Sequence, residues 1–274
     1  MKLKELQKHW NRFGKEDPLW AIATAPDKRG NRWKLDEFFE TGNQEIKSVL
    51  EYAASMGLTI PRKKALDFGC GVGRLTQALA EHFDEVAGID IAPSMLEQAK
   101  QYNRFGDRCR YYLNASSGLS LFADKTFDFI YTNMVLQHMR PVYAKAYIRE
   151  FVRILTPDGI AIFQVAGGQV SEPARREPQK PMPELPRPQA RGVVAGVKRL
   201  TKAVLPKRLV DWYIKYQNSR HGGPIMEMYP LTREDIEEVV EAAGASILDI
   251  RQDNEAGIGW LSFRYVVART ACRV

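Results

Sequence analysis

The residues with the clearest chemical potential are three glycines that alternate with other residues directly after an apolar run. Gly69, Gly71 and Gly73 follow a run at residues 65–68 that contains Asp67. Glycine lets a backbone bend sharply and lets a ligand approach the main chain closely. The spacing Gly-x-Gly-x-Gly differs from the Gly-x-Gly-x-x-Gly pattern that cradles a pyrophosphate. An acid at position 67 would repel a pyrophosphate, so the pattern predicts a ligand that carries a cation, such as an aminoacyl or sulfonium group.

Further polar positions follow three later apolar runs. Asp90 lies seventeen residues beyond Gly73, and a carboxylate there can accept hydrogen bonds from both hydroxyls of a ribose. Asn114 follows the next run, where an amide can face the edge of an adenine. Residues 132–139 follow the run after that. Open α/β sheets bind ligands at the carboxyl ends of their strands, so these positions predict a ligand site along one edge of a sheet.

The elements that must position these residues are short strands and amphipathic helices in alternation. Strands are expected at residues 65–68, 85–90, 110–113, 127–132 and 160–165, helices at 74–83, from 93 and at 142–155, and a turn at 156–159. This alternation predicts βαβ units and a parallel sheet. Thr232 is the expected N-cap of a later helix at 231–243, which precedes two last strands at 245–251 and 260–268. The predicted fold class is α/β: a Rossmann-like, seven-stranded, mostly parallel sheet with helices on both faces, an N-terminal helical leader and a helical cap insert after the fifth strand.

Two motifs and one acid resemble a known family. The glycine-rich segment with Asp67, then Asp90, then the stretch Phe151-x-x-Ile154-Leu155-x-Pro157-x-Gly159 are similar to the class I S-adenosylmethionine-dependent methyltransferases, in particular the small-molecule, ubiquinone-biosynthesis-like (type 11) group. The resemblance covers roughly residues 60–166 and extends to the last two strands. It implies S-adenosylmethionine (SAM) as cofactor, S-adenosylhomocysteine as product, and no metal.

The resemblance also implies a role for individual positions. The glycines would lie under the methionine part of the cofactor, Asp90 would hold the ribose, and Ile91 and Met95 would flank the adenine. Asn114 stands where the family more often has Asp, and Ala115 would contribute its backbone N–H. The expected cofactor-binding residues are Asp67, Gly69, Cys70, Gly71, Gly73, Asp90, Ile91, Met95, Asn114, Ala115, Asn133 and Met134.

Composition excludes several classes of protein. The 274 residues are 45% hydrophobic and 27% charged, as in ordinary globular proteins, so wholesale disorder, collagen and coiled coil are not expected. Three widely spaced cysteines without a CxxC pair favour neither a disulfide framework nor a zinc site. No apolar run approaches the roughly 20 residues of a membrane span, and the first residues lack the apolar region of a secretory signal. We therefore expect a cytoplasmic protein.

The charge of +7 is concentrated in one segment. Residues 167–224 carry twelve Lys or Arg against four acids and include eight prolines. Its second part, between Arg191 and Lys215, has the pattern of two basic amphipathic helices. These helices would form a cap over the active site, a contact for a membrane surface or anionic partner, or a solvated pair. The predicted units are a helical leader or lid at 1–58, a SAM-binding core at 59–166, the basic insert at 167–225 and the end of the core at 226–274.

The reaction implied is an in-line displacement in which an acceptor atom attacks the methyl group of a sulfonium. A base is needed only when the acceptor loses a proton, as a hydroxyl does. Candidate bases are His138, which otherwise seats the following helix, and His221 or Tyr229, which would line a substrate pocket. We favour O-methylation of a small molecule in a biosynthetic pathway.

Two other functions remain open from the residues alone. The basic insert would suit a nucleic-acid or peptide methyltransferase, although nucleic acid is disfavoured because no recognisable binding module accompanies it. Residues 132–135 also lack the Asn/Asp-Pro-Pro-aromatic motif typical of adenine-N6 and glutamine methyltransferases. The other alternative is a non-catalytic binding protein built on the cofactor fold.

Overall fold

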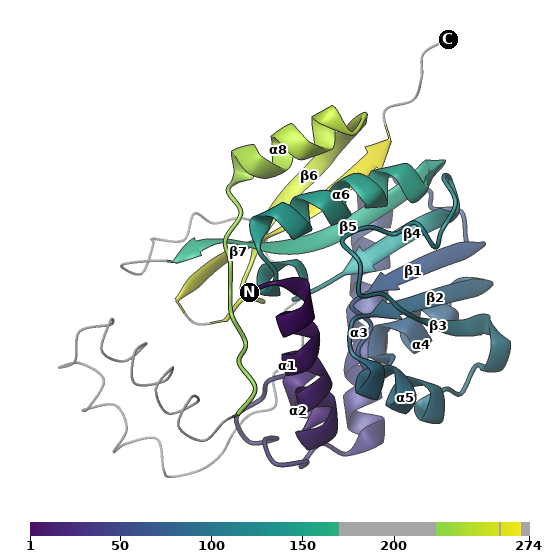
Figure 1. Ribbon diagram of the computed structural model, residues 1–274. Helices are drawn as coiled ribbons and strands as arrows, with labels where there is room; N and C mark the ends of the chain where they lie inside the picture. The colour runs from purple at the N-terminus through teal and green to yellow at the C-terminus, as the bar shows by residue number, and fades with distance from the viewer. Residues whose placement is uncertain (170–222, 258, 270–274) are drawn as a thin grey trace.

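The computed structural model describes residues 1–169, 223–257 and 259–269 (Figure 1). The predicted cap helices between Arg191 and Lys215, and the candidate base His221, lie outside these residues. Within the described ranges, no helix is both long and apolar enough to cross a membrane.

Seven strands form one sheet in the order β3-β2-β1-β4-β5-β7-β6. The strands are β1 (Lys64–Phe68), β2 (Glu85–Asp90), β3 (Cys109–Leu113), β4 (Phe127–Thr132), β5 (Leu155–Gln169), β6 (Ala245–Asp253) and β7 (Trp260–Arg269). Neighbours from β3 to β5 pair in parallel, and β7 is antiparallel to both β5 and β6. This arrangement confirms the predicted fold class. The strand order reverses between β1 and β4, and in open α/β sheets such a switch point opens a crevice for ligands.

The clearest difference between the predicted and observed boundaries lies between helix α6 (Pro141–Ile154) and β5. Helix α6 ends one residue earlier than expected, and β5 begins at once with Leu155. The expected turn at 156–159 lies inside β5 as an irregularity, because pairing with β4 runs from Phe127–Leu155 directly to Phe129–Ile160. The bulged residues keep extended backbone while they are out of register, so turn-forming residue types did not end the strand.

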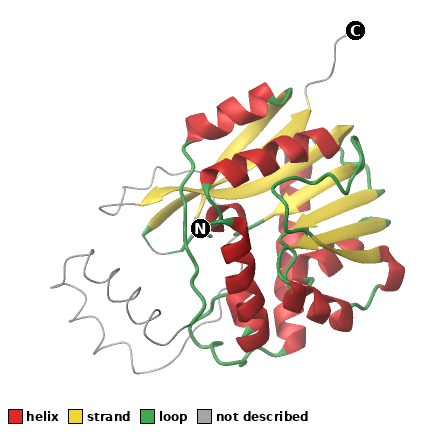
Figure 2. Cartoon of the chain, viewed as in Figure 1, coloured by secondary structure: helices red, strands yellow, loops and turns green. Residues whose placement is uncertain are grey.

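Helices cover both faces of the sheet (Figure 2). On one face, α3 (Leu35–Ser55) and α4 (Arg74–Ala80) pack against Ala65 and Phe129. On the other, α6 and α8 (Arg233–Ala242) pack against Leu66 and Ile130. Neighbouring strand residues thus point to opposite faces, as the period of two in a strand requires. Helix α5 (Pro93–Tyr102) follows β2 and contacts β3.

The N-terminal segment divides between the core and the ligand edge. The longest helix, α3, is part of the core. Helices α1 (Leu3–Glu16) and α2 (Pro18–Ile22) instead lie beside the carboxyl ends of the parallel strands (Figure 1). A separate apolar cluster fixes them there, in which Phe13 and Ala21 pack with Val72 and Met95. The leader therefore reaches the turn that follows β1.

Candidate functional site

The turn after β1 has a backbone that only glycine adopts readily. Gly69, Gly71 and Gly73 have φ values of 77°, 53° and 85°. A Cβ atom added at Gly71 would lie 2.5 Å from Cδ1 of Ile22, and one at Gly69 would collide with the side chain of Val135. The three glycines are therefore required both by conformation and by close packing. They leave a stretch of bare main chain at the switch point of the sheet.

Asp90 ends β2 and braces this turn. Its Oδ2 accepts a hydrogen bond of 2.9 Å from the Gly71 N–H, and its Oδ1 accepts one of 2.8 Å from the Ala92 N–H. Burial raises the pKa of the Asp90 carboxyl, and the backbone donors act in the opposite direction. An ionised carboxylate offers about four acceptor positions. Two are used here, which leaves capacity for the two hydroxyls of a ribose.

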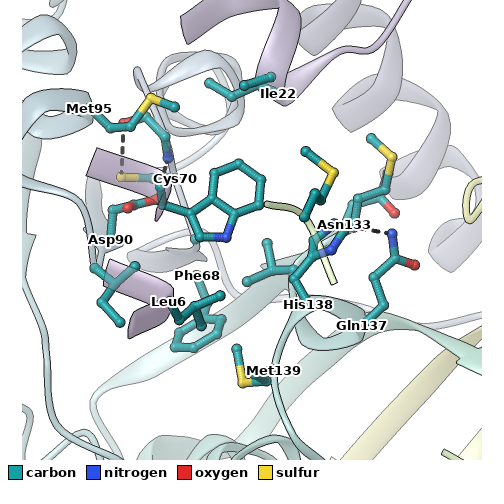
Figure 3. Close-up of a pocket in the computed structure, with 18 of the residues that line it drawn as sticks. Leu6, Ile22, Phe68, Cys70, Asp90, Met95, Asn133, Gln137, His138 and Met139 are labelled. Carbon is teal, nitrogen blue, oxygen red and sulfur yellow. Dashed lines mark hydrogen bonds between the residues drawn. The ribbon is translucent and has the colours of Figure 1, made fainter. Parts of the chain in front are cut away.

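These residues line one pocket, a cavity of about 220 Å³ (Figure 3). We call one part of its lining the Asp90 side, which consists of Gly69, Cys70, Gly71, Asp90 and Met95. The part we call the His138 side consists of Trp10, Gln137, His138, Met226 and Met228. Figure 3 shows Asp90, Cys70 and Met95 facing Asn133, Gln137 and His138 across the cavity. Of the other predicted residues, Ile91, Asn114 and Met134 also line it.

Two predicted cofactor residues of the glycine segment are absent from the described lining. Asp67 is 1% exposed, and its Oδ2 accepts a hydrogen bond of 2.6 Å from the Thr76 hydroxyl. Burial raises the pKa of Asp67 to about 7. Gly73 is the N-cap of α4 and lies against the ring of Tyr111. Both residues therefore contact parts of the fold next to the turn and do not line the pocket.

The segment after β3 is partly engaged with itself. The Asn114 amide donates a hydrogen bond of 3.0 Å to the Gly118 carbonyl, and its Oδ1 accepts one of 2.8 Å from the Ser116 hydroxyl. Asn114 nevertheless lines the pocket, whereas Ala115 is exposed and is not among the described lining residues. The side chain of Asn114 thus shapes its own loop at the edge of the pocket.

Of the candidate bases, His138 lines the pocket. It ends the short 3-10 helix η2 (Leu136–His138) and is 5% exposed. Its Nδ1 lies 2.9 Å from the Glu227 carbonyl oxygen, and its ring centroid lies 5.4 Å from that of Trp10. Burial lowers the pKa of His138 to about 4. Tyr229 is not among the described lining residues, and its hydroxyl contacts the Glu227 carboxylate.

A buried ion pair lies beneath the pocket. The Arg74 guanidinium and the Glu45 carboxylate are 2.9 Å apart, and each side chain is 5% exposed. Asn133 Nδ2 and the Tyr131 hydroxyl also donate to Glu45, at 2.8 and 2.9 Å. Burial alone would raise the pKa of Glu45, but Arg74 and Arg264 hold it below its usual value. The pair ties α3 to the first residue of α4.

Known proteins share this domain. Residues 66–163 match the family described as a methyltransferase domain. These residues thus form a methyltransferase domain of the class I S-adenosylmethionine-dependent type. Phosphoethanolamine N-methyltransferase 3 of Arabidopsis thaliana is 32% identical over 161 residues, which are 52% of this chain and 32% of that protein. Ubiquinone biosynthesis O-methyltransferase of Cereibacter sphaeroides is 28% identical over 153 residues, 56% of each protein.

The same fold occurs in solved structures. The magnesium protoporphyrin IX methyltransferase of Synechocystis PCC 6803, solved with bound S-adenosylhomocysteine, superimposes with a TM-score of 0.57. The two proteins are 18% identical, and the alignment covers 97% of this chain and 98% of that one. By contrast, the chain spans about half or less of the length of the curated relatives named above. The similarity to those relatives therefore concerns the domain they share.

Trp10, Arg74 and Glu255 line the pocket, although no motif in the sequence predicts them. Burial raises the pKa of Glu255 to about 7, and the nearby charge of Glu45 acts in the same direction. Arg74 had one available signal, since it directly follows the glycine turn. The others reach the pocket only through tertiary packing.

The N-terminal leader is hydrogen-bonded directly to the residues that follow β2 at the edge of the pocket. Gln7 on α1 donates a hydrogen bond of 3.0 Å to the Ile91 carbonyl. Asn11 accepts hydrogen bonds of 2.9 Å from the Ser94 N–H and 2.7 Å from the Ser94 hydroxyl. Helix α1 is thus placed so that Leu6 and Trp10 face the cavity. In the described part of the chain, no group of three or more His, Cys, Asp or Glu residues is arranged to hold a metal ion.

Proposed function

We propose that this chain transfers a methyl group from SAM to the hydroxyl of a small molecule. One observation carries the proposal: the bare glycine turn and Asp90 share a single cavity with His138. A donor held on the Asp90 side would have its acceptor on the His138 side. Alignment of the acceptor atom, the methyl carbon and the leaving sulfur is then the main contribution of the protein.

The residues of the pocket fit the cofactor. Asp90 has acceptor capacity for both ribose hydroxyls, and Ile91 and Met95 offer an apolar surface for the adenine. Two buried polar atoms of the lining, Asn133 Oδ1 and Arg74 Nε, have no hydrogen-bond partner among the described residues. The Asn133 oxygen could accept a hydrogen bond from the ammonium of the methionine part, and Arg74 Nε could donate one to its carboxylate. Such bonds would be favourable because a buried polar group without a partner destabilises the fold.

His138 is the base we favour. SAM, when bound, would supply a methyl carbon that an acceptor oxygen attacks in line, and S-adenosylhomocysteine would be the leaving group. Because the pKa of His138 is about 4, its ring is neutral at pH 7 and has a lone pair to offer. The same low pKa makes the ring a weak base, so it would take the hydroxyl proton as the new carbon–oxygen bond forms and the hydroxyl becomes acidic.

Competing roles stay as predictions. Tyr229 and His221 remain alternative bases, although the Tyr229 hydroxyl is already in contact with Glu227. Methylation of a nucleic acid or peptide through the basic insert, and non-catalytic binding, remain alternative functions. The apolar lining contributed by Leu3, Leu6 and Met226 supports a small, largely apolar acceptor over these. We also propose the unit boundaries 1–58, 59–166, 167–225 and 226–274 and a cytoplasmic location.

Cofactor titration tests the proposal. We expect calorimetry to detect binding of SAM and S-adenosylhomocysteine but not of NAD. Asp90→Ala should weaken binding about 100-fold or more, because it removes two hydrogen bonds to a charged group, each of which contributes about 1.5–3 kcal/mol. Gly71→Arg should abolish binding, since a side chain there meets Ile22 and fills the approach to the main chain.

Asp107→Ala is the matched control, because Asp107 is an exposed carboxylate outside the pocket. It should bind like the wild type. Folded wild-type protein that fails to bind either cofactor at millimolar concentration would refute the proposal. Once binding is established, formation of S-adenosylhomocysteine in the presence of apolar hydroxyl compounds identifies the acceptor class.

A further inference from the structure

A chain of buried hydrogen bonds runs from β5 through η2 to the segment at residues 223–231. The Met134 N–H lies 3.1 Å from Oε1 of Gln164, whose Nε2 lies 3.0 Å from Oε1 of Gln137. The Nε2 of Gln137 lies 3.4 Å from Nε2 of His138. The other ring nitrogen, Nδ1, lies 2.9 Å from the Glu227 carbonyl oxygen. Gln164, Gln137 and His138 are 1%, 4% and 5% exposed, so solvent scarcely competes with these bonds.

Both ends of this chain have a fixed polarity. A backbone N–H only donates, so the atom beside Met134 must be the oxygen of the Gln164 amide. Gln164 therefore turns its NH₂ group to the Gln137 oxygen, and Gln137 turns its own NH₂ group to His138. At the other end, a carbonyl oxygen only accepts, so His138 Nδ1 must carry a proton. Each end of the chain of hydrogen bonds therefore independently requires a proton on Nδ1 and a lone pair on Nε2.

We infer that Gln164 and Gln137 are positioning residues that fix His138 as the neutral Nδ1–H tautomer, with Nε2 kept as an acceptor. The inference rests on the proposed function for its catalytic meaning, but the tautomer itself is a property of the folded chain. The nitrogen that carries the proton in a histidine ring is set by the hydrogen bond of the other nitrogen. Here both ring nitrogens are constrained.

This state of the ring matters for chemistry. A base must present a lone pair to the acceptor hydroxyl, and the Nε2–H tautomer would present a proton there. The contact between Gln137 and His138, at 3.4 Å, is longer than the usual 2.7–3.2 Å of an N–H hydrogen bond. An acceptor hydroxyl can therefore take its place at Nε2 while the bond from Nδ1 to Glu227 keeps the ring oriented.

The arrangement also couples His138 to a distant part of the chain. The Tyr229 N–H donates a hydrogen bond of 2.7 Å to the Gln137 carbonyl. Glu227 and Tyr229 thus hold η2 through alternate residues of one extended segment. The base and the segment that carries Met226 and Met228 form one unit, so the acceptor pocket and the proton acceptor are assembled together.

Nitrogen NMR of the full-length chain tests the inference without requiring turnover. With ¹⁵N-labelled histidine, long-range ¹H–¹⁵N spectra report whether each ring nitrogen carries a proton. The chain has four histidines, and His138→Gln identifies the signals of His138. If that variant does not fold, substitution of His9, His82 and His221 assigns His138 by elimination. We expect a protonated Nδ1 and an unprotonated Nε2 near pH 7.

Gln164→Glu should change this state. A carboxylate cannot donate, so Gln137 would turn its NH₂ group to the introduced carboxylate and its oxygen to His138, which favours a proton on Nε2. We expect His138 to become protonated on both nitrogens in this variant. Gln252→Glu adds the same charge at an exposed strand position and should leave the His138 signals unchanged.

The outcomes separate the tautomer from the activity. A wild-type His138 that carries its proton on Nε2 would overturn the inference even if Gln164→Glu failed to fold. An unchanged His138 spectrum in folded Gln164→Glu would also overturn it. Failure of SAM binding in calorimetry would refute the proposed function alone, because the NMR spectrum is recorded on the chain without ligand.

Discussion

The two sides of the pocket are built in different ways. The Asp90 side comes mainly from the ends of two adjacent strands, and its bracing bond joins Asp90 to Gly71, nineteen residues apart. The His138 side joins segments from opposite ends of the chain. Ile225 donates a hydrogen bond to His9 across 216 residues, and His138 contacts both Trp10 and Glu227.

This difference supports the proposed division of the pocket between the cofactor and the acceptor. A cofactor shared by a whole family is held by backbone geometry, which a short motif can encode. An acceptor particular to one protein is held by side chains that variable segments bring together. If this division holds, substitutions on one side should leave the other side largely unchanged.

The largest effect is expected from the ion pair beneath the pocket. Arg74→Met should lower the free energy of unfolding by about 3–5 kcal/mol, because it removes the ion-pair partner of the buried Glu45 carboxylate. Arg12→Met is the control, since Arg12 pairs with Glu16 at the surface, where a pair contributes about 0–1 kcal/mol. Urea unfolding measures both. A loss below about 1 kcal/mol for Arg74→Met would mean that the glycine turn does not depend on α3.

The next effect concerns pH and the His138 side. The pKa of His138 is about 4 in the folded protein, against an ordinary value of 6.5. Between these values the unfolded chain binds more protons, so this group makes the free energy of unfolding rise with pH, by at most about 1.4 kcal/mol per unit. The stability is fully present above pH 6.5 and is lost as pH falls through the folded pKa.

His138→Gln should remove this contribution, so the difference in stability between wild type and variant should grow between pH 4 and pH 6.5. Asp67 acts in the opposite sense, because its raised pKa of about 7 favours folding at low pH and loses that effect as pH rises. Asp67 is present in both proteins, so its effect cancels in the difference. Parallel curves for the two proteins would contradict the buried, neutral state of His138.

The residues of the Asp90 side were easier to predict from the sequence than those of the His138 side. The seven strands, the glycine turn and Asp90 were accessible from sequence because each depends on neighbours in the chain or on strand ends. Asp67 and Gly73 belong to the same motif, yet they contact Thr76 and Tyr111 and do not line the pocket. Spacing alone cannot distinguish residues of the motif that line the pocket from residues that do not. The irregularity inside β5 was missed because turn-forming residue types also occur in bulges.

On the His138 side, single residues could be recognised without their partners. His138 was recognisable as a candidate base, but its partner Glu227 lies 89 residues away. Gln137 and Gln164 are ordinary as residue types, and their role depends on being buried in register with each other. Trp10 lies in the leader, and its place at the pocket depends on the packing of α1.

The smallest effect tests whether the His138 side can be loosened alone. Thr232 follows the segment that carries Met226 and Met228, and its hydroxyl accepts a hydrogen bond of 3.1 Å from the Asp235 N–H. The Asp235 carboxylate in turn accepts from the Thr232 N–H at 3.2 Å, as in a capping box. Thr232→Ala should therefore lower the free energy of unfolding by about 1 kcal/mol.

The same variant should leave SAM affinity unchanged, because no bond of the Asp90 side described above involves α8 or its cap. Thr59→Ala, at an exposed position outside any helix, should change neither quantity. Urea unfolding and calorimetry on the same samples give both measurements. If loss of the cap weakened cofactor binding as much as it weakened folding, the two sides of the pocket would be one cooperative unit. If only stability fell, the acceptor side could change its contacts while the cofactor side stayed intact, as a fold that serves many acceptors requires.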